Sequence, residues 1–461
     1  MLLIAADQLR YDSIEPSGLR PVRTPHLSKL AKEGATFRNA FTHFPVCCPA
    51  RQSLLHGRRP ETFGALWNYS GALPVASLRP EAFSWPRTLA ELGYASAYLG
   101  KWGVSREHDA TAFGYDVYVG EEEYASFAKA KYPDVSYAFG YFGETSPIPV
   151  EDASTHWFAR RAVDELERLC ATGRPWHMSL HFAEPHLPCR PSGPFADMYD
   201  PASIEEWPGF RDSFEGKPYI QRQQLFSWGI ERFEWNDWAP IVARYFGVIS
   251  QLDDAVGLVL DALERLGAAD RTVVVFTADH GDMCGSHRMM DKHYVMYDDV
   301  LRVPLLIRWP GRVPAQTRDE FVYPFLDWAP TLLDMLGAPD RPPGGFHGTS
   351  LAPMLTGDGP PIERKEVVAT YNGQQFGLYT QRAIRTERWK YVWNTTDVDE
   401  LYDLKRDPAE LENRIRDDTL ADVVRELRLR LYEALRRDGD PLVGNEWTRR
   451  QLVDGRKIAP R

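Results

Sequence analysis

Short runs of apolar residues alternate along the chain with longer segments in which apolar residues recur every three or four positions. The apolar runs lie at 2–6, 95–100, 177–182 and 272–278. They are typical of strands buried on both faces of a sheet. Segments with helical periodicity lie at 24–34, 154–173 and 245–267. Because strands alternate with helices, we predict an α/β fold, a large mixed and mostly parallel sheet sandwiched between helices.

A second, smaller unit is predicted after a segment rich in proline and glycine at 338–366. Residues 379–394 alternate apolar and polar positions as antiparallel strands do, and a helix is expected at about 418–437. We therefore place a large domain at 1–365 and a small C-terminal antiparallel sheet with a helix at 366–461.

Several other residues are expected to have structural roles. The aromatic-rich residues 205–239 are irregular in pattern, and they either pack as a surface insertion or line a substrate cleft. Asp253 and Asp254 are expected on the solvent face of their helix, and Asp282 is expected to cap a loop. Trp102 is expected in the core.

The composition is that of a globular protein and narrows the range of partners. Of 461 residues, 43% are hydrophobic and 26% are charged, which is enough to build a sizeable core. The formal net charge of −11 argues against broad binding to nucleic acid or to acidic membranes. It does not exclude a small anionic substrate held in a local positive pocket.

The cysteines do not suggest a disulfide framework. There are five of them, and no Cys-x-x-Cys spacing for a zinc site occurs: Cys47, Cys48, Cys170, Cys189 and Cys284. No apolar run reaches the ~18 residues of a membrane span. The chain opens on an apolar strand pattern without a basic segment or a cleavage site before it. We expect a cytoplasmic protein, or a periplasmic one if a leader has been removed.

Polar residues follow two of the predicted strands directly. Asp7 and Gln8 follow the first strand, and Asp279 and His280 follow the strand at 272–278. Because parallel strands end at the same edge of a sheet, where ligands bind, we expect these side chains to meet. Three oxygen donors and one nitrogen suit Ca²⁺ or Mg²⁺ and tolerate Mn²⁺, and a set without clustered thiolates disfavours zinc. We predict a divalent metal site here.

The adjacent cysteines begin a motif. Cys47, Pro49 and Arg51 form Cys-x-Pro-x-Arg, followed by Ser-Leu-Leu-x-Gly-Arg-Arg-Pro. This resembles the signature of the type I sulfatases, formylglycine-dependent enzymes of the alkaline phosphatase superfamily. The resemblance implies that a maturation enzyme converts Cys47 to formylglycine, which is both the nucleophile and a metal ligand. Cys48 then occupies the motif's variable position and only packs.

The resemblance extends over most of the chain. It includes "LGYASAYLGKWG", "HFAEPHLP" and the long block that begins "FTADHGDM". It implies catalytic roles for Arg51, Lys101, His186 and Lys292, the last three also contacting the sulfate ester. It also implies calcium at the metal site, with magnesium or manganese as alternatives. His181 and His293 are expected to be neighbours rather than participants.

The function implied is hydrolysis of a sulfate ester, with sulfur attacked by the hydrated aldehyde to give a covalent sulfo-enzyme. The segments resemble bacterial sulfatases of carbohydrates, including iduronate-type enzymes, so the substrate is expected to be a small-molecule or oligosaccharide sulfate ester. One alternative is a phosphonate monoester or phosphodiester hydrolase of the same superfamily, although Lys101 favours sulfate. Others are a catalytically impaired sulfatase-like protein and, more remotely, a redox or metal sensor.

One position departs from the family pattern. The family usually reads Gly-Lys-Trp-His, but this chain has glycine at position 103. The missing histidine is the expected base for breakdown of the sulfo-enzyme, so a burst of alcohol followed by slow turnover is expected. His108 is the nearest replacement in sequence, and Gly103→His is expected to speed the slow phase if its neighbours leave room.

Overall fold

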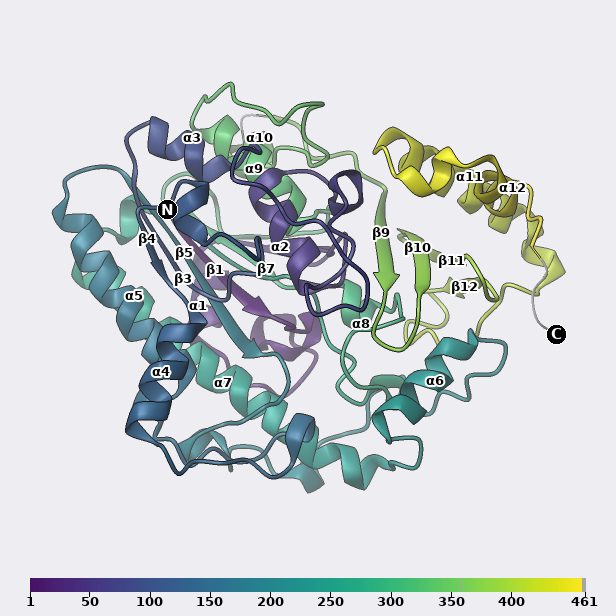
Figure 1. The fold of residues 1–461 in the computed structure, drawn as a ribbon, viewed down its shortest axis with the longest axis horizontal. Helices are drawn as coiled ribbons and strands as arrows, with labels where there is room; N and C mark the ends of the chain where they lie inside the picture. The colour runs from purple at the N-terminus through teal and green to yellow at the C-terminus, as the bar shows by residue number, and fades with distance from the viewer. Residues whose placement is uncertain (358, 458–461) are drawn as a thin grey trace.

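The strands form two sheets in the computed structural model, which describes residues 1–357 and 359–457 (Figure 1). The larger sheet has eight strands in the order β4-β3-β5-β1-β6-β7-β2-β8. From β4 to β6 all neighbours are parallel, and β7 is antiparallel to both of its neighbours. Its strands are β1 Leu2–Asp7, β2 Ala35–Phe37, β3 Ala95–Gly100, β4 Val117–Val119, β5 Trp176–Pro185, β6 Val274–Ala278, β7 Leu305–Arg308 and β8 Gln316–Arg318.

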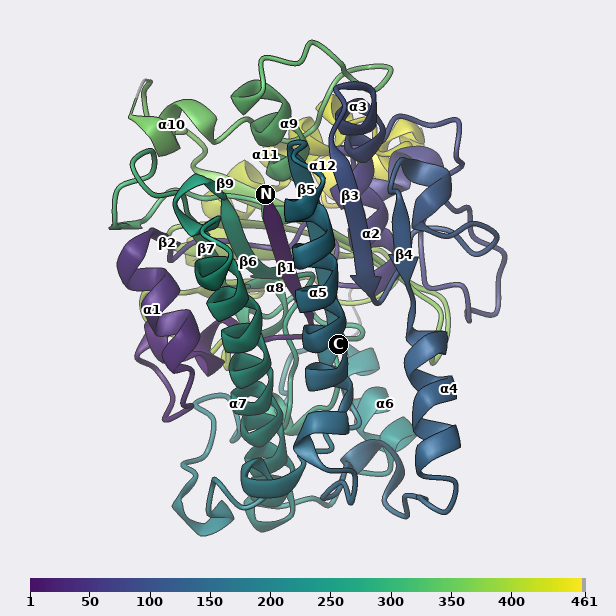
Figure 2. The same ribbon diagram turned by 90° about the vertical axis from the view of Figure 1, so that its left-hand side faces the viewer.

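Helices cover both faces of this sheet. Helices α1, α5 and α7 lie on one face, and α2, α3 and α9 lie on the other (Figures 1 and 2). Every residue of β1, β3 and β6 is buried, because these strands are covered on both sides. The helices of this part are α1 Pro25–Glu33, α2 Cys47–His56, α3 Trp85–Glu91, α4 Glu121–Lys131, α5 Ser154–Ala171, α6 Tyr219–Trp228, α7 Trp235–Arg265, α8 Asp298–Leu301, α9 Pro324–Met335 and α10 Ala352–Thr356.

The smaller sheet is antiparallel and packs beside the large unit. Its order is β12-β11-β10-β9, and α11 covers its outer face (Figure 1). Buried ion pairs join it to the rest of the chain, including Arg59 with Asp438 at 2.8 Å. Among the described residues, no helix is both long enough and apolar enough to cross a bilayer. The elements are β9 Glu366–Gly373, β10 Tyr379–Thr386, β11 Trp389–Asn394, β12 Glu400–Asp403, α11 Ala421–Arg437 and α12 Glu446–Val453.

The predicted fold class is confirmed, and the differences are local. Helix α7 begins at Trp235, ten residues before its predicted start, because Glu234 and Asp237 form a capping box ahead of Pro240. Residues 205–239 therefore contain the start of α7 and all of α6. Pro240 is the reason that the first residues of α7 were not predicted as helical, since proline usually interrupts a helical pattern.

The expectation that Asp253 faces solvent was wrong. Its side chain is only 1% exposed. Its carboxylate accepts hydrogen bonds from the backbone N–H groups of His26 at 3.0 Å and Leu27 at 2.8 Å. It thereby satisfies free donors at the start of α1, whose own N-cap side chain makes no capping bond. Asp282 does cap a loop, accepting from the Cys284 N–H at 2.8 Å.

Candidate active site

The polar residues that follow β1, β3 and β6 lie together at the carboxyl edge of the sheet. Gly100 ends β3 with φ +96°, and a Cβ there would lie 1.9 Å from the His181 carbonyl oxygen, so only glycine fits. The chain then places the ammonium of Lys101 2.6 Å from the Asp7 carboxylate. This edge of the sheet therefore carries Asp7 and Gln8, which are predicted metal ligands, beside Lys101, which is predicted to bind the substrate.

Cys47 stands in the first turn of α2, where free N–H groups and the helix dipole favour an anion. Its Sγ lies 3.3 Å from His280 Nε2, 3.7 Å from Asp7 Oδ1 and 3.9 Å from Lys101 Nζ. Burial and Asp7 raise the pKa of the thiol, but Lys101, Lys292 and His280 outweigh them and hold it well below its usual range. Residue 47 is thus placed for anionic chemistry.

Cys48 has a different environment although it is the next residue. Burial, and secondarily Cys47, raises the pKa of its thiol to about 12. Its backbone N–H donates to Asn68 Oδ1 at 3.0 Å. A protonated thiol is a weak nucleophile and a weak metal ligand, so the two cysteines are chemically unequal.

Four side chains form a candidate metal centre. Ligand atoms of Asp7, Cys47, Asp279 and His280 all lie within 4.8 Å of one another, and all four residues are buried. The Nδ1 of His280 bonds to the Gly281 carbonyl at 3.0 Å, which leaves Nε2 facing the other three. Burial and the nearby Asp7 carboxylate raise the pKa of Asp279. A divalent cation would stabilise both carboxylates in their charged form.

Gln8 is oriented by two carboxylates that the sequence did not single out for this purpose. Its Nε2 donates to Asp282 at 2.7 Å and to Asp291 at 3.1 Å, so its amide oxygen is fixed toward Lys292 Nζ at 2.8 Å. The backbone of Gln8 has φ +66°, a conformation that is rare outside glycine and concentrates at functional sites. The donors of Asp7, Asp279 and His280 fit a hard divalent cation, and the Gln8 amide oxygen is held beside Lys292.

Arg51 binds the two carboxylates of the candidate metal centre. Its Nε donates to Asp279 at 3.0 Å and its Nη2 donates to Asp7 at 3.1 Å. Its Nη1 donates to the Lys101 carbonyl at 3.0 Å and lies 2.9 Å from His181 Nδ1. Arg51 therefore holds both carboxylates and the Lys101 segment in place. His181 had been expected only as a neighbour, and it is the neighbour of Arg51.

Lys292 and His186 meet on the other side of Gln8. Lys292 Nζ lies 2.8 Å from His186 Nε2, and His186 Nδ1 bonds to the Leu187 carbonyl at 2.8 Å. Asp291 pairs with Lys292 at 3.2 Å and with His293 at 3.1 Å. Asp291 is a site residue that sequence reasoning missed, and only its position beside Lys292 could have suggested it.

The position of the missing histidine is tightly packed. Gly103 has φ +64°, and a Cβ there would lie 3.1 Å from Arg51 Cδ. His108 has an exposed side chain, and its carbonyl, not its imidazole, accepts a hydrogen bond from the Trp102 indole at 2.8 Å. Trp102 is in the core, as expected. The structure therefore gives no support to His108 as a replacement base.

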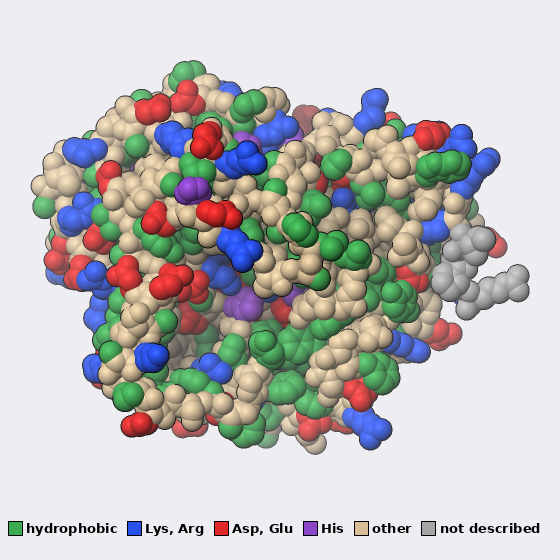
Figure 3. Space-filling model, viewed as in Figure 1, with side chains coloured by type: hydrophobic (Ala, Val, Ile, Leu, Met, Phe, Trp, Pro, Cys, Tyr) green, Lys and Arg blue, Asp and Glu red, His purple; other side chains and the backbone are tan. Residues whose placement is uncertain are grey.

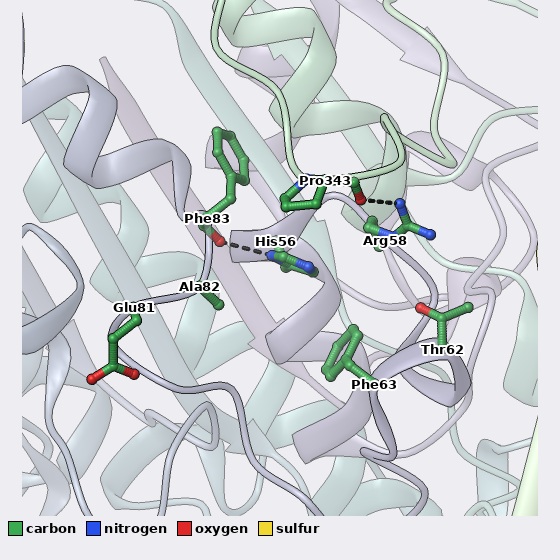
Figure 4. Close-up of a pocket in the computed structure, with 8 residues that line it drawn as sticks. All are labelled: His56, Arg58, Thr62, Phe63, Glu81, Ala82, Phe83 and Pro343. Carbon is green, nitrogen blue, oxygen red and sulfur yellow. Dashed lines mark hydrogen bonds between the residues drawn. The ribbon is translucent and has the colours of Figure 1, made fainter.

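Figure 3 shows the face of the molecule onto which this edge of the sheet opens, hollowed near its centre. A different hollow lies at the far end of α2, about 13.5 Å along the helix from Cys47 (Figure 4). There His56 Nδ1 bonds to the Phe83 carbonyl at 2.8 Å and Arg58 donates to the Pro343 carbonyl at 2.5 Å. Both groups bond to backbone carbonyls, and the residues that line this hollow include none of the predicted site residues.

Comparisons with known proteins agree with this geometry. The sequence model of the sulfatase family matches residues 1–338, and that of the C-terminal part of N-sulphoglucosamine sulphohydrolase matches residues 285–437. An ulvan-active sulfatase of Formosa agariphila is 29% identical over 97% of this chain and 83% of its own. A choline-sulfatase of Rhizobium meliloti is 28% identical over 90% of this chain and 81% of its own.

A solved structure shares the fold. The phosphonate monoester hydrolase of Agrobacterium radiobacter superposes with a TM-score of 0.81 at 24% identity, over 95% of each chain. At that identity the likeness shows the fold alone. Because the sulfatase model spans well over half of the sequence, the chain belongs to the sulfatase family of sulfuric ester hydrolases.

Proposed function

We propose that this sulfatase hydrolyses sulfate esters of carbohydrates, with residue 47 as its nucleophile after conversion of Cys47 to formylglycine. The observation that carries the proposal is the position of Cys47, in a helix N-terminus and within 4 Å of Asp7, Lys101 and His280. When hydrated, the formylglycine aldehyde supplies a hydroxyl nucleophile. The ulvan-active relative supports a carbohydrate substrate.

The proposed metal ligands are Asp7, Gln8, Asp279, His280 and the modified residue 47. We propose calcium, with magnesium or manganese as alternatives, because oxygen donors predominate. A bound cation would neutralise sulfate oxygens and favour ionisation of the nucleophile. The residues of the chain prepare this site, since Arg51 holds the two carboxylates and Asp282 and Asp291 fix the Gln8 amide.

The remaining charged groups are proposed to act on the ester itself. Lys101 and Lys292 bind sulfate oxygens from two sides, and preorganised charges of this kind usually supply the largest single contribution to rate. His186 protonates the departing alcohol through Nε2, the atom that lies beside Lys292 Nζ. Cys47 is only 3% exposed, so we propose that the maturation enzyme acts before folding buries it.

The domain division is proposed as well, with a catalytic domain at 1–365 and a C-terminal subdomain at 366–461. The small sheet begins with β9 at Glu366, and residues 458–461 lie outside the described part of the chain. The phosphonate or phosphodiester alternative remains a competing activity for the same residues. Retention of the Gly-Lys-Trp segment that carries Lys101 favours sulfate.

Lys292→Ala is expected to lower kcat/KM for a sulfate ester by about 10²–10³-fold, because it removes a buried donor aimed at the reacting group. The measurement is steady-state hydrolysis of an aryl sulfate by matured, calcium-loaded enzyme. Lys405→Ala is the matched control, since Lys405 is an exposed lysine paired with Glu387. A loss of only a few-fold in Lys292→Ala would remove Lys292 from the mechanism.

Turnover is expected to show a burst of alcohol product followed by a slow steady state, because Gly103 provides no base for the second step. General-base assistance is typically worth ~10²–10⁴-fold. Rapid-mixing kinetics with an aryl sulfate measure both phases. His108→Ala should leave both unchanged. Gly103→His is not expected to rescue the slow phase here, since φ +64° and the Arg51 contact strain any side chain. A linear time course without a burst would show that another residue supplies the base.

A further inference from the structure

Three aromatic side chains from distant segments form a continuous surface, which we call the aromatic wall: Tyr141, Trp228 and Phe376. The ring centroids of Tyr141 and Trp228 lie 5.3 Å apart at 89°. Those of Trp228 and Phe376 lie 6.2 Å apart at 85°. Edge-to-face contacts of this kind hold rings in fixed orientations. The wall combines the loop before α5, the end of α6 and the connection between β9 and β10.

The aromatic wall is attached to the segment that carries Lys292. The Phe376 N–H donates to Tyr294 Oη at 2.6 Å, and the two rings are stacked with centroids 5.6 Å apart. On α6, the Gln224 amide donates to the His293 carbonyl. Tyr294 and His293 follow Lys292 directly, so the wall is joined through these two residues to the segment that carries Lys292.

Aromatic exposure is concentrated around the wall. Among the described residues, four of the five exposed aromatic side chains come from the segments that build it: Phe139, Tyr141, Tyr219 and Phe226, which are 60–65% exposed. Hydrophobic side chains gather beside and below the central hollow in Figure 3. Clustered exposure of this kind marks a binding surface rather than ordinary scatter.

Two carboxylates are close enough to Lys101 to interact with it electrostatically. Glu121, in the first turn of α4, and Glu184, two residues before His186, both interact electrostatically with Lys101. Burial raises the pKa of Glu184 to about 7, and its Oε2 is buried without a hydrogen-bond partner. The partnerless oxygen of Glu184 can accept a hydrogen bond from a hydroxyl, and the Glu121 carboxylate repels an additional anion.

We propose that the alcohol portion of the substrate is an uncharged pyranose whose apolar C–H face packs on Trp228, with its hydroxyls toward Glu121 and Glu184. Polyanionic uronate-containing chains are disfavoured. This inference rests on the proposed sulfatase function, because it concerns the leaving-group side of that site. It goes beyond that function by naming the sugar class and the residues that select it.

The test is a set of dissociation constants measured by ligand-observed NMR on the calcium-loaded Cys47→Ala protein, which needs no turnover. The probes are methyl glucopyranoside 6-sulfate, a methyl glucuronide sulfate and ethyl sulfate, which has no ring. Trp228→Ala should raise Kd for the glucoside about 10-fold and leave Kd for ethyl sulfate unchanged. Trp228→Phe should retain most of the affinity. The matched control is Trp447→Ala, since Trp447 is 73% exposed on α12.

The glucuronide should bind more weakly than the glucoside, and Glu121→Gln should narrow that gap by about threefold. Tighter binding of the glucuronide would overturn the proposal. So would an unchanged glucoside Kd in Trp228→Ala, or an equal loss for ethyl sulfate, which would show that the tryptophan only supports the fold. Because hydrolysis is not measured, these outcomes are independent of whether the matured enzyme cleaves sulfate esters.

Discussion

Cys47→Ala is expected to abolish hydrolysis of sulfate esters, with kcat falling by at least about 10⁴-fold, while Cys48→Ala retains most of the activity. The reason is the environment of each thiol. Residue 47 faces Lys101, His280 and Asp7 within 4 Å, whereas Cys48 packs against Gly103 with a thiol whose pKa is raised to about 12. The measurement is steady-state kinetics of both variants after coexpression with a maturation enzyme.

The two cysteine variants are matched controls for each other, because both remove one sulfur from the same turn of α2. Circular dichroism and thermal unfolding should show that both variants fold. Equal losses from the two substitutions would contradict the assignment of the nucleophile. Cys47→Ser should be as inactive as Cys47→Ala, unless the maturation enzyme also oxidises serine, which peptide mass spectrometry would reveal.

Removal of divalent metal is expected to eliminate activity, and Asp279→Asn should weaken metal binding more than about 100-fold. Asp279 would supply one of the two carboxylates that bind the metal, and it also forms an ion pair with Arg51. Loss of its charge therefore weakens both the metal site and the ion pair. Asp282→Asn should have a smaller effect, about 10–100-fold, because Asp282 acts through the orientation of Gln8. Calcium affinity measured by calorimetry on chelator-treated protein gives both values.

Asp261→Asn serves as the control, since Asp261 is exposed on α7 and remote in sequence from the site. Full activity in a metal-free preparation would contradict the proposed cation site. A requirement met only by zinc would show that the donor set had been misinterpreted, since hard oxygen donors favour calcium or magnesium.

The polar residues at the carboxyl edge of the sheet were predictable from sequence. Each of them directly follows a strand pattern, and both features can be recognised within a few neighbouring residues. Asp7 and Asp279 lie 272 positions apart, yet each directly follows a buried apolar run, and parallel strands bring such positions together. The role proposed for Cys47 came from the resemblance of its motif to that of the sulfatases, since a buried cysteine is otherwise an ordinary core residue. The fold class followed from alternation of strands and helices, and the structure confirms it.

The remaining site contacts depend on how loops fold back, which no local pattern encodes. Asp291 fixes Gln8 across 283 positions, from a segment in which five non-glycine residues between 284 and 294 have positive φ. The burial of Asp253 depends on α1 packing against α7, so its helical position alone suggested solvent. The aromatic wall likewise joins three segments separated by more than 80 positions each.

The central claim is that residue 47, matured from Cys47, is used to cleave sulfate esters in preference to other esters. The most direct measurement compares kcat/KM for phenyl sulfate and for phenyl phenylphosphonate, with sulfate and phosphonate release quantified by ion chromatography. The enzyme must carry formylglycine at position 47, verified by peptide mass spectrometry, and bound calcium. We predict at least about a tenfold preference for the sulfate ester. A preference for the phosphonate ester, or no release of sulfate from verified enzyme, would contradict the account.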